Sequence, residues 1–135
     1  MLHDFISTTA ADAKQIAGPS YYTGCWTHRD SNKLELWLAN APAEVLRELE
    51  ELHPGTYLIH NDAPRSEAAL FELMDALPVR GLKAEGIRVV RVGPTRDGYL
   101  HVRVMGDVPT AQARLDAMFG NNVAQVEYGE PAVAC

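Results

Sequence analysis

Histidine and cysteine are the residues of this chain best suited to metal binding or nucleophilic catalysis, and it has five histidines and two cysteines. No two histidines are spaced two or four residues apart, and Cys25 and Cys135 form no CxxC pair. Three histidines fall on or beside expected strands, where they could converge with one cysteine as metal ligands or as a nucleophile with its base. These candidates are Cys25, His28, His60 and His101.

Motifs of common enzyme and cofactor sites are missing from the sequence. It contains no phosphate-binding loop, dinucleotide-binding glycine motif, zinc-protease motif, serine-hydrolase elbow or EF-hand loop. We therefore expect a protein that is not an enzyme and that uses no metal and no cofactor. The alternative is a small enzyme, or a small-ligand or metal-binding protein, that uses the four candidate residues.

The composition is typical of a folded globular protein. The chain has 135 residues, of which 47% are hydrophobic and 22% charged, and a formal net charge of −6. The acidic balance argues against nucleic-acid binding, and no apolar run approaches the roughly 20 residues of a membrane span. A local positive bias in the second half leaves room for one anionic partner. It comes from Arg80, Lys83, Arg88, Arg91 and Arg96.

Hydrophobic patterning predicts the elements that position these residues. Residues 33–39 and 99–105 alternate between apolar and polar side chains, as strands with one buried face do. Residues 78–86 are expected to be a connector. Strands are predicted over 21–28, 33–39, 56–60, 87–92, 99–105 and 123–128. Helices are predicted over 5–17, from Pro42 to Pro54, from Ser66 to Pro78 and from Pro109 to Gly120.

The predicted elements occur in the same order twice, at an offset near 66 residues between Leu34 and Leu100. We therefore expect an α+β fold of two repeated α-β-β-α-β halves, each with a mostly antiparallel sheet and helices on one face. The halves are 1–62 and 63–135, as two domains or one compact domain. Two unrelated halves are the alternative to a repeat.

The outward faces of the two alternating strands are the candidate contact surface. Aromatic and charged side chains on a strand are common in protein contacts. In the alternative, Trp37 and Tyr99 pack against each other. The expected partner-binding residues are Glu35, Trp37, Tyr99, His101 and Arg103. The apolar face of each alternating strand and the apolar stripe of each predicted helix together predict the core. It includes Leu34, Leu36, Leu38, Leu46, Leu49, Leu70, Leu100, Val102, Val104 and Leu115. The apolar stripe of the helix predicted from Ser66 to Pro78 also contains Phe71 and Met74.

One stretch resembles a known protein family. Residues Tyr22 to Leu38 (YTGCWTHRDSNKLELWL), followed by a helix and the strand at Tyr57, resemble the pro-regions of secreted serine proteases of the alpha-lytic and streptogrisin type. Those pro-regions are folding chaperones and inhibitors of their proteases. The resemblance implies a regulatory module, inhibitor-like or chaperone-like, that presents a sheet to a protein partner.

Partners and location follow from these expectations. We expect another protein as the partner, with no nucleic acid and no membrane, and a homodimer through edge strands is a further alternative. The N-terminus has no basic segment followed by an apolar stretch, so no signal peptide is expected. This predicts a cytoplasmic location, or secretion if a signal was removed.

Overall fold

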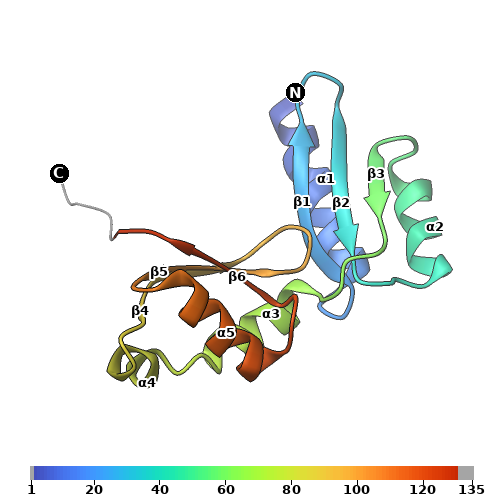
Figure 1. Cartoon of the computed structure of the whole chain (residues 1–135). Coiled ribbons are helices and arrows are strands. Elements are labelled where there is room, and N and C mark those ends of the chain that lie inside the picture. Colours follow the sequence, from blue (N-terminus) through green and yellow to red (C-terminus); the bar gives the residue numbers. More distant parts are fainter. Residues whose placement is uncertain (1, 131–135) are drawn as a thin grey trace. The chain divides into compact units, whose positions relative to one another are not determined.

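The computed structural model describes the backbone of residues 2–130 and the side chains of residues 8–130. It divides into two compact units (Figure 1). The first comprises the chain up to Ala69 together with Arg96–Gly98, and the second comprises Leu70–Thr95 and the chain from Tyr99 onward. The boundary expected between residues 62 and 63 stays a prediction.

The first unit contains a three-stranded sheet and two helices. The strands lie in the order β1-β2-β3, with β1 antiparallel and β3 parallel to β2. Both helices pack on the sheet face that carries Leu34, Leu36 and Leu38, and no helix among the described residues of this unit covers the opposite face. The elements are α1 (Leu2–Ala17), β1 (Tyr22–His28), β2 (Lys33–Leu38), α2 (Ala43–Leu52) and β3 (Tyr57–His60).

The second unit has the same strand order and pairing. Its sheet runs β4-β5-β6, with β4 antiparallel and β6 parallel to β5. Its three helices pack on the face of Leu100, Val102 and Val104. The elements are α3 (Glu67–Asp75), α4 (Val79–Ala84), β4 (Arg88–Pro94), β5 (Leu100–Met105), α5 (Val108–Phe119) and β6 (Ala124–Tyr128).

The α+β class is confirmed, and in both units the helices cover one face of the sheet. Each sheet is mixed rather than mostly antiparallel, because a helix connects its last two strands and returns the chain in the same direction. The two sheets share the same strand order and the same pairing directions. The repeat itself stays a prediction, since α4 has no counterpart in the first unit.

The connector expected over 78–86 contains helix α4, which corrects the sequence interpretation. The helix follows Pro78 and has one buried residue, Leu82, so it is too short to show a helical period. In α3 the side chain of Phe71 is 46% exposed, whereas Leu73 and Met74 pack against the core with Leu70. The buried stripe therefore follows the spacing of Leu70, Leu73 and Met74.

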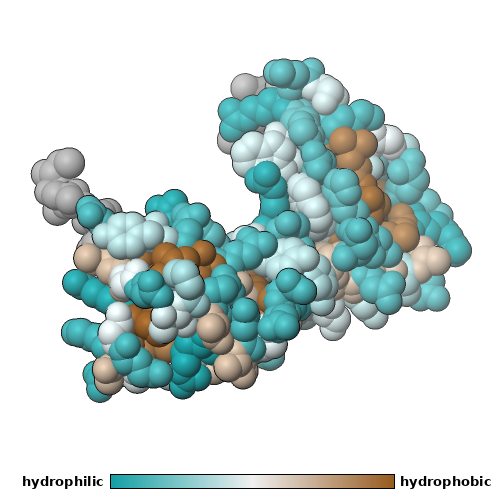
Figure 2. All heavy atoms as spheres, in the orientation of Figure 1, coloured by the Kyte–Doolittle hydropathy of each residue, from teal (hydrophilic) through white to brown (hydrophobic). Residues whose placement is uncertain are grey.

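Each unit has its own hydrophobic core. The expected core residues are buried with one exception, since Leu46 is half-buried at the margin of the first core. Hydrophilic residues cover most of the visible surface in Figure 2, and hydrophobic ones gather over the region of β3 and α2. Leu52 and Leu58, in these two elements, are exposed. Within residues 2–130, no helix is long and apolar enough to cross a membrane.

Candidate functional site

Strand register assembles one surface on the open face of the first sheet. Glu35 and Trp37 in β2 point away from the core, because Leu34, Leu36 and Leu38 fill it. Trp26 in β1 lies opposite Glu35, and Gly24 lies opposite Trp37. His60 in β3 is the neighbour of Trp37 on the other side. We call this surface the tryptophan face. It comprises Trp26, His28, Glu35, Trp37, His60 and Arg96.

Glu35 connects two histidines at the centre of the tryptophan face. One carboxylate oxygen lies 2.5 Å from His28 Nε2, and the other lies 2.9 Å from His60 Nε2. These hydrogen bonds hold the pKa of Glu35 below its ordinary value, and the bond to His28 has the larger effect, followed by that to His60. Glu35 therefore stays an anion that both imidazoles orient.

Two aromatic contacts and one cation complete the tryptophan face. The ring of Trp37 stacks on His60, with centroids 4.9 Å apart and planes 20° apart. The guanidinium of Arg96 lies 4.4 Å from the ring centroid of Trp26 and 5.5 Å from that of Trp37. These are cation–π distances. Trp26 is nevertheless 51% exposed, so much of its ring is available for contact.

The position of Arg96 depends on a glycine. A Cβ on Gly24 would lie 2.5 Å from Arg96 Cα and 2.7 Å from the Arg96 carbonyl oxygen. Only glycine allows this close approach. Arg65 holds the same segment, since its Nη1 donates to the Gly98 carbonyl at 2.9 Å and its own carbonyl accepts from Thr23 Oγ1 at 2.8 Å. Arg96 is thus fixed above the two tryptophans.

The open face of the second sheet carries a different set of side chains. Glu127 Oε1 lies 2.8 Å from Arg103 Nε and 3.2 Å from His101 Nε2. These contacts, His101 first and Arg103 second, lower the pKa of Glu127. Arg91 lies directly opposite Arg103. We call this surface the arginine face. It comprises Arg88, Arg91, His101, Arg103 and Glu127.

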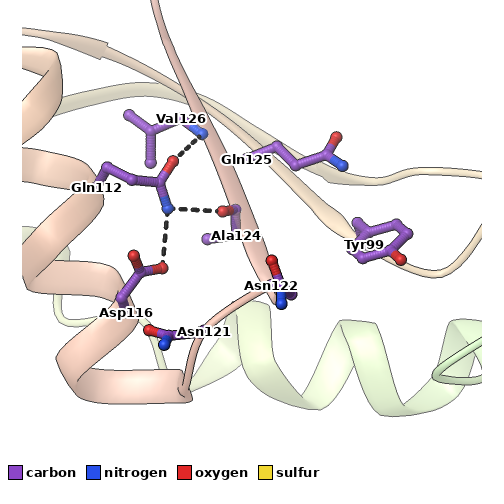
Figure 3. A pocket seen from close by; sticks show the side chains of 8 residues that line it. All are labelled: Tyr99, Gln112, Asp116, Asn121, Asn122, Ala124, Gln125 and Val126. Carbon is purple, nitrogen blue, oxygen red and sulfur yellow. Dashed lines mark hydrogen bonds between the residues drawn. The ribbon is translucent and has the colours of Figure 1, made fainter.

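Tyr99 lines a separate hollow of about 700 Å³ in the second unit, drawn in Figure 3. Gln112 of α5 spans the wall of this hollow. Its amide donates to the Ala124 carbonyl at 2.8 Å and to Asp116 Oδ1 at 2.9 Å, and its oxygen accepts from Val126 N at 3.0 Å (Figure 3). The side chain of Gln112 therefore connects α5 to β6 rather than being left for a ligand.

The four candidate catalytic or metal-binding residues are not brought to one place. His28 and His60 meet at Glu35, whereas Cys25 alternates to the helix-covered face and packs against the first core. There the hydroxyl of Tyr22 donates to Cys25 Sγ at 3.5 Å, and burial raises the pKa of Tyr22. His101 belongs to the second unit. Cys135 lies outside the described residues.

No group of three or more histidine, cysteine, aspartate or glutamate side chains in the described part of the chain is arranged to hold a metal ion. The five residues expected to bind a partner are divided by the fold. Glu35 and Trp37 belong to the tryptophan face, and His101 and Arg103 to the arginine face. Tyr99 lines the hollow of Figure 3.

Sequence reasoning missed Trp26 and Arg96 as members of the site. Hairpin pairing around the turn at residues 29–32 would have found Trp26, because it sets His28 opposite Lys33 and Trp26 opposite Glu35. No sequence signal places Arg96, whose neighbours are distant along the chain. No protein-family model, curated protein or solved structure matches this chain, so its function has to follow from its own surfaces.

Proposed function

We propose that this chain is a non-enzymatic protein-binding module with a regulatory role, inhibitor-like or chaperone-like. Its contact surface is the tryptophan face, and its ligand is an extended, acidic segment of a partner protein. The observation that carries the proposal is the half-exposed ring of Trp26 beneath the guanidinium of Arg96. Tryptophan and arginine are among the residues most enriched where binding energy concentrates in protein interfaces.

The place of Trp26 at a sheet edge favours an extended ligand. Among the described residues strand β1 has one neighbour in its sheet, and a hollow of about 550 Å³ is lined by six consecutive residues from Cys25 to Asp30. A segment in the strand conformation can hydrogen-bond to such an edge. Its alternate side chains would then point toward Trp26 and His28.

The charges of the tryptophan face favour an acidic ligand. Within the described residues Arg96 has no carboxylate at ion-pair distance, and its guanidinium lies on the two indole rings. The one carboxylate of the face, Glu35, is already bound by His28 and His60. An acidic side chain beside an apolar one would pair with Arg96 while the apolar one covers Trp26.

The alternative function, a small enzyme or ligand-binding protein, has one observation in its favour. His28 and His60 both lie on Glu35 and together offer acid and base groups on one open surface. Cys25 could not act as their nucleophile, since it points to the opposite face of the sheet. This alternative predicts binding of a small molecule rather than of a peptide.

Peptide selection tests the proposal directly. The purified protein is used to select binders from a displayed library of random peptides, and the binders are titrated while indole fluorescence is followed. Trp26 and Trp37 are the two tryptophans of the chain, so the emission reports on the tryptophan face alone. We expect selected peptides in which Asp or Glu alternates with apolar residues.

Matched variants show whether the selected peptides use the proposed surface. Trp26→Ala should weaken their binding at least tenfold, as loss of a dominant interface tryptophan does. Tyr128→Ala removes an aromatic ring that is 54% exposed on β6 and should change binding less than about twofold. Failure to select any peptide, or equal binding by wild type and Trp26→Ala, would reject the proposal.

A further inference from the structure

The arginine face places two like charges side by side. Arg91 of β4 and Arg103 of β5 are direct partners in the antiparallel register. Like charges directly opposite each other on neighbouring strands are destabilising. The irregularity in the register between Val89 and Arg91 brings Arg91 to the open face beside Arg103, instead of into the core. The sheet therefore carries an electrostatic cost at this point.

The carboxylate on this face does not cancel the positive charge. Glu127 binds Arg103 and His101, and in the described part of the chain neither Arg91 nor Arg88 has a carboxylate at ion-pair distance. Three guanidinium groups against one carboxylate leave two positive charges, even with His101 neutral. An anion with two negative charges would match them.

A hollow lies where such an anion could bind. It has a volume of about 250 Å³ and is lined by Arg91, Gly93, Pro94, His101 and Arg103. Gly93 lies directly opposite His101, and a Cβ added to it would meet no atom within 4 Å. The bare backbone of Gly93 thus leaves room beside His101, and Arg91 and Arg103 both line the hollow.

We propose that this hollow is a binding site for a phosphomonoester group, held by Arg91 and Arg103 with His101 beside them. A phosphomonoester carries about −1.5 to −2 charges at pH 7, which matches the net charge of the arginine face, where Glu127 offsets one of three guanidinium groups. A carboxylate carries a single negative charge and would offset only part of the net positive charge of the arginine face. The planar guanidinium fork binds two phosphate oxygens at once, which a lone ammonium group does not do.

The site is tested by titrating the full chain with phenyl phosphate and following the binding by calorimetry. Phenylsulfonate, which has a similar shape and one negative charge, is the ligand control. We expect Arg91→Gln and Arg103→Gln each to weaken phenyl phosphate binding at least tenfold, as loss of a charge-assisted pair does. Arg80→Gln on α4 removes the same charge from an exposed position of the same unit and should change the affinity less than about twofold.

Thermal melting separates this site from a merely structural role for Arg91. Without phosphate, Arg91→Gln should melt at or above the wild-type temperature, because it relieves the repulsion from Arg103. Phenyl phosphate should raise the melting temperature of the wild type and not that of Arg91→Gln. No binding of phenyl phosphate, or an equal loss in Arg80→Gln, would overturn the proposal.

A vesicle arm identifies the source of the phosphate group. Vesicles that contain phosphatidic acid present a phosphomonoester at a membrane surface, and phosphatidylcholine vesicles are their control. If binding depends on Arg91 and is stronger to these vesicles than to phenyl phosphate, the phosphate belongs to a lipid headgroup. If binding is stronger to phenyl phosphate, the ligand is a soluble phosphomonoester. If the wild type and Arg91→Gln bind equally well in both the vesicle and the phenyl phosphate titrations, the site is excluded.

Discussion

The two units use one strand topology to display two different chemistries. In both, an antiparallel strand and a parallel strand flank a central strand whose inward residues are Leu or Val. The open face of the first sheet presents indole and imidazole rings, whereas that of the second presents guanidinium groups. The inward positions are constrained by packing and the outward ones are not, so the same frame can carry unrelated binding surfaces.

Each open face contains a glutamate that two basic side chains hold, but the partners differ. Glu35 lies on the central strand between two histidines, and Glu127 lies on an outer strand between a histidine and an arginine. The Glu127 cluster keeps the permanent charge of Arg103 at every pH at which the protein is folded. The Glu35 cluster has no permanent cation among its two bridging partners.

Core truncation should give the largest effect and tests whether the two cores are equivalent. Leu34 and Leu100 are both buried and occupy the same place in the topology, each opposite the first residue of the parallel strand. Replacing either by Ala should cost about 2–5 kcal/mol, since it leaves a cavity. Urea denaturation followed by circular dichroism measures both losses. A cost below about 1 kcal/mol at one site would show that its core is loosely packed.

A glycine pair should give the next largest effect. Gly24→Ala forces a Cβ against the backbone of Arg96 and should destabilise the protein by about 1–3 kcal/mol, as overpacking does. Gly93→Ala, on the corresponding edge strand of the second sheet, meets open space and should change stability by less than about 0.5 kcal/mol. The midpoints of urea denaturation compare the two variants. Equal losses of stability in the two variants would mean that the backbone of Arg96 does not pack closely against Gly24.

Alkaline unfolding should begin in the first unit. Tyr57 is buried and donates a hydrogen bond to the Thr9 carbonyl at 2.7 Å, and burial raises its pKa from 10.0 to about 12. A raised pKa contributes stability below pH 10 that is lost as the pH rises from 10 to 12. Tyr128 is 54% exposed and Tyr99 half-buried, so the second unit has no tyrosine as deeply buried within residues 70–130.

Tyr57→Phe tests this difference, with indole fluorescence as the signal from the first unit. The variant should lose about 0.5–1.5 kcal/mol at neutral pH, because its hydrogen bond is gone. Between pH 10 and 12 its stability should fall less steeply than that of the wild type. If the stability of the variant falls as steeply between pH 10 and 12 as that of the wild type, ionisation of Tyr57 does not destabilise the fold.

The smallest effect is expected from the two bridging glutamates. The lowered pKa of Glu35, set first by His28 and then by His60, contributes stability above the ordinary value of 4.5 that is lost as the pH falls further. Glu35→Gln should therefore flatten the acid denaturation curve measured by indole fluorescence. Glu127→Gln should leave that fluorescence curve unchanged, because both tryptophans lie in the first unit. Identical curves for Glu35→Gln and the wild type would contradict this.

The elements with strict alternation were predictable from sequence, and the register between strands was less so. The alternation of Leu34, Leu36 and Leu38 defines both faces of β2, since a period of two leaves no other arrangement. Helix α4 has a single buried residue and therefore gave no period to detect. The parallel pairing of β3 and β6 could have been inferred, because a strand that follows a crossing helix returns in the same direction.

The candidate sites depended on contacts that composition does not encode. Glu35 was identified as an outward residue, but its two histidines are 7 and 25 positions away along the chain. Only the register of three strands brings them together. Likewise, Arg91 faces Arg103 because of a one-residue irregularity in β4. Such irregularities depend on local backbone geometry, which the pattern of apolar residues does not show.

The amide of Gln112 has a consequence for how large the second sheet can grow. It accepts from Val126 N and donates to the Ala124 carbonyl, two groups on the outer edge of β6 that an additional strand would otherwise engage. One side chain thus occupies a donor and an acceptor that a fourth strand would need (Figure 3). A strand added at this part of β6 would have to displace Gln112, which disfavours the stepwise addition of strands that leads to fibres.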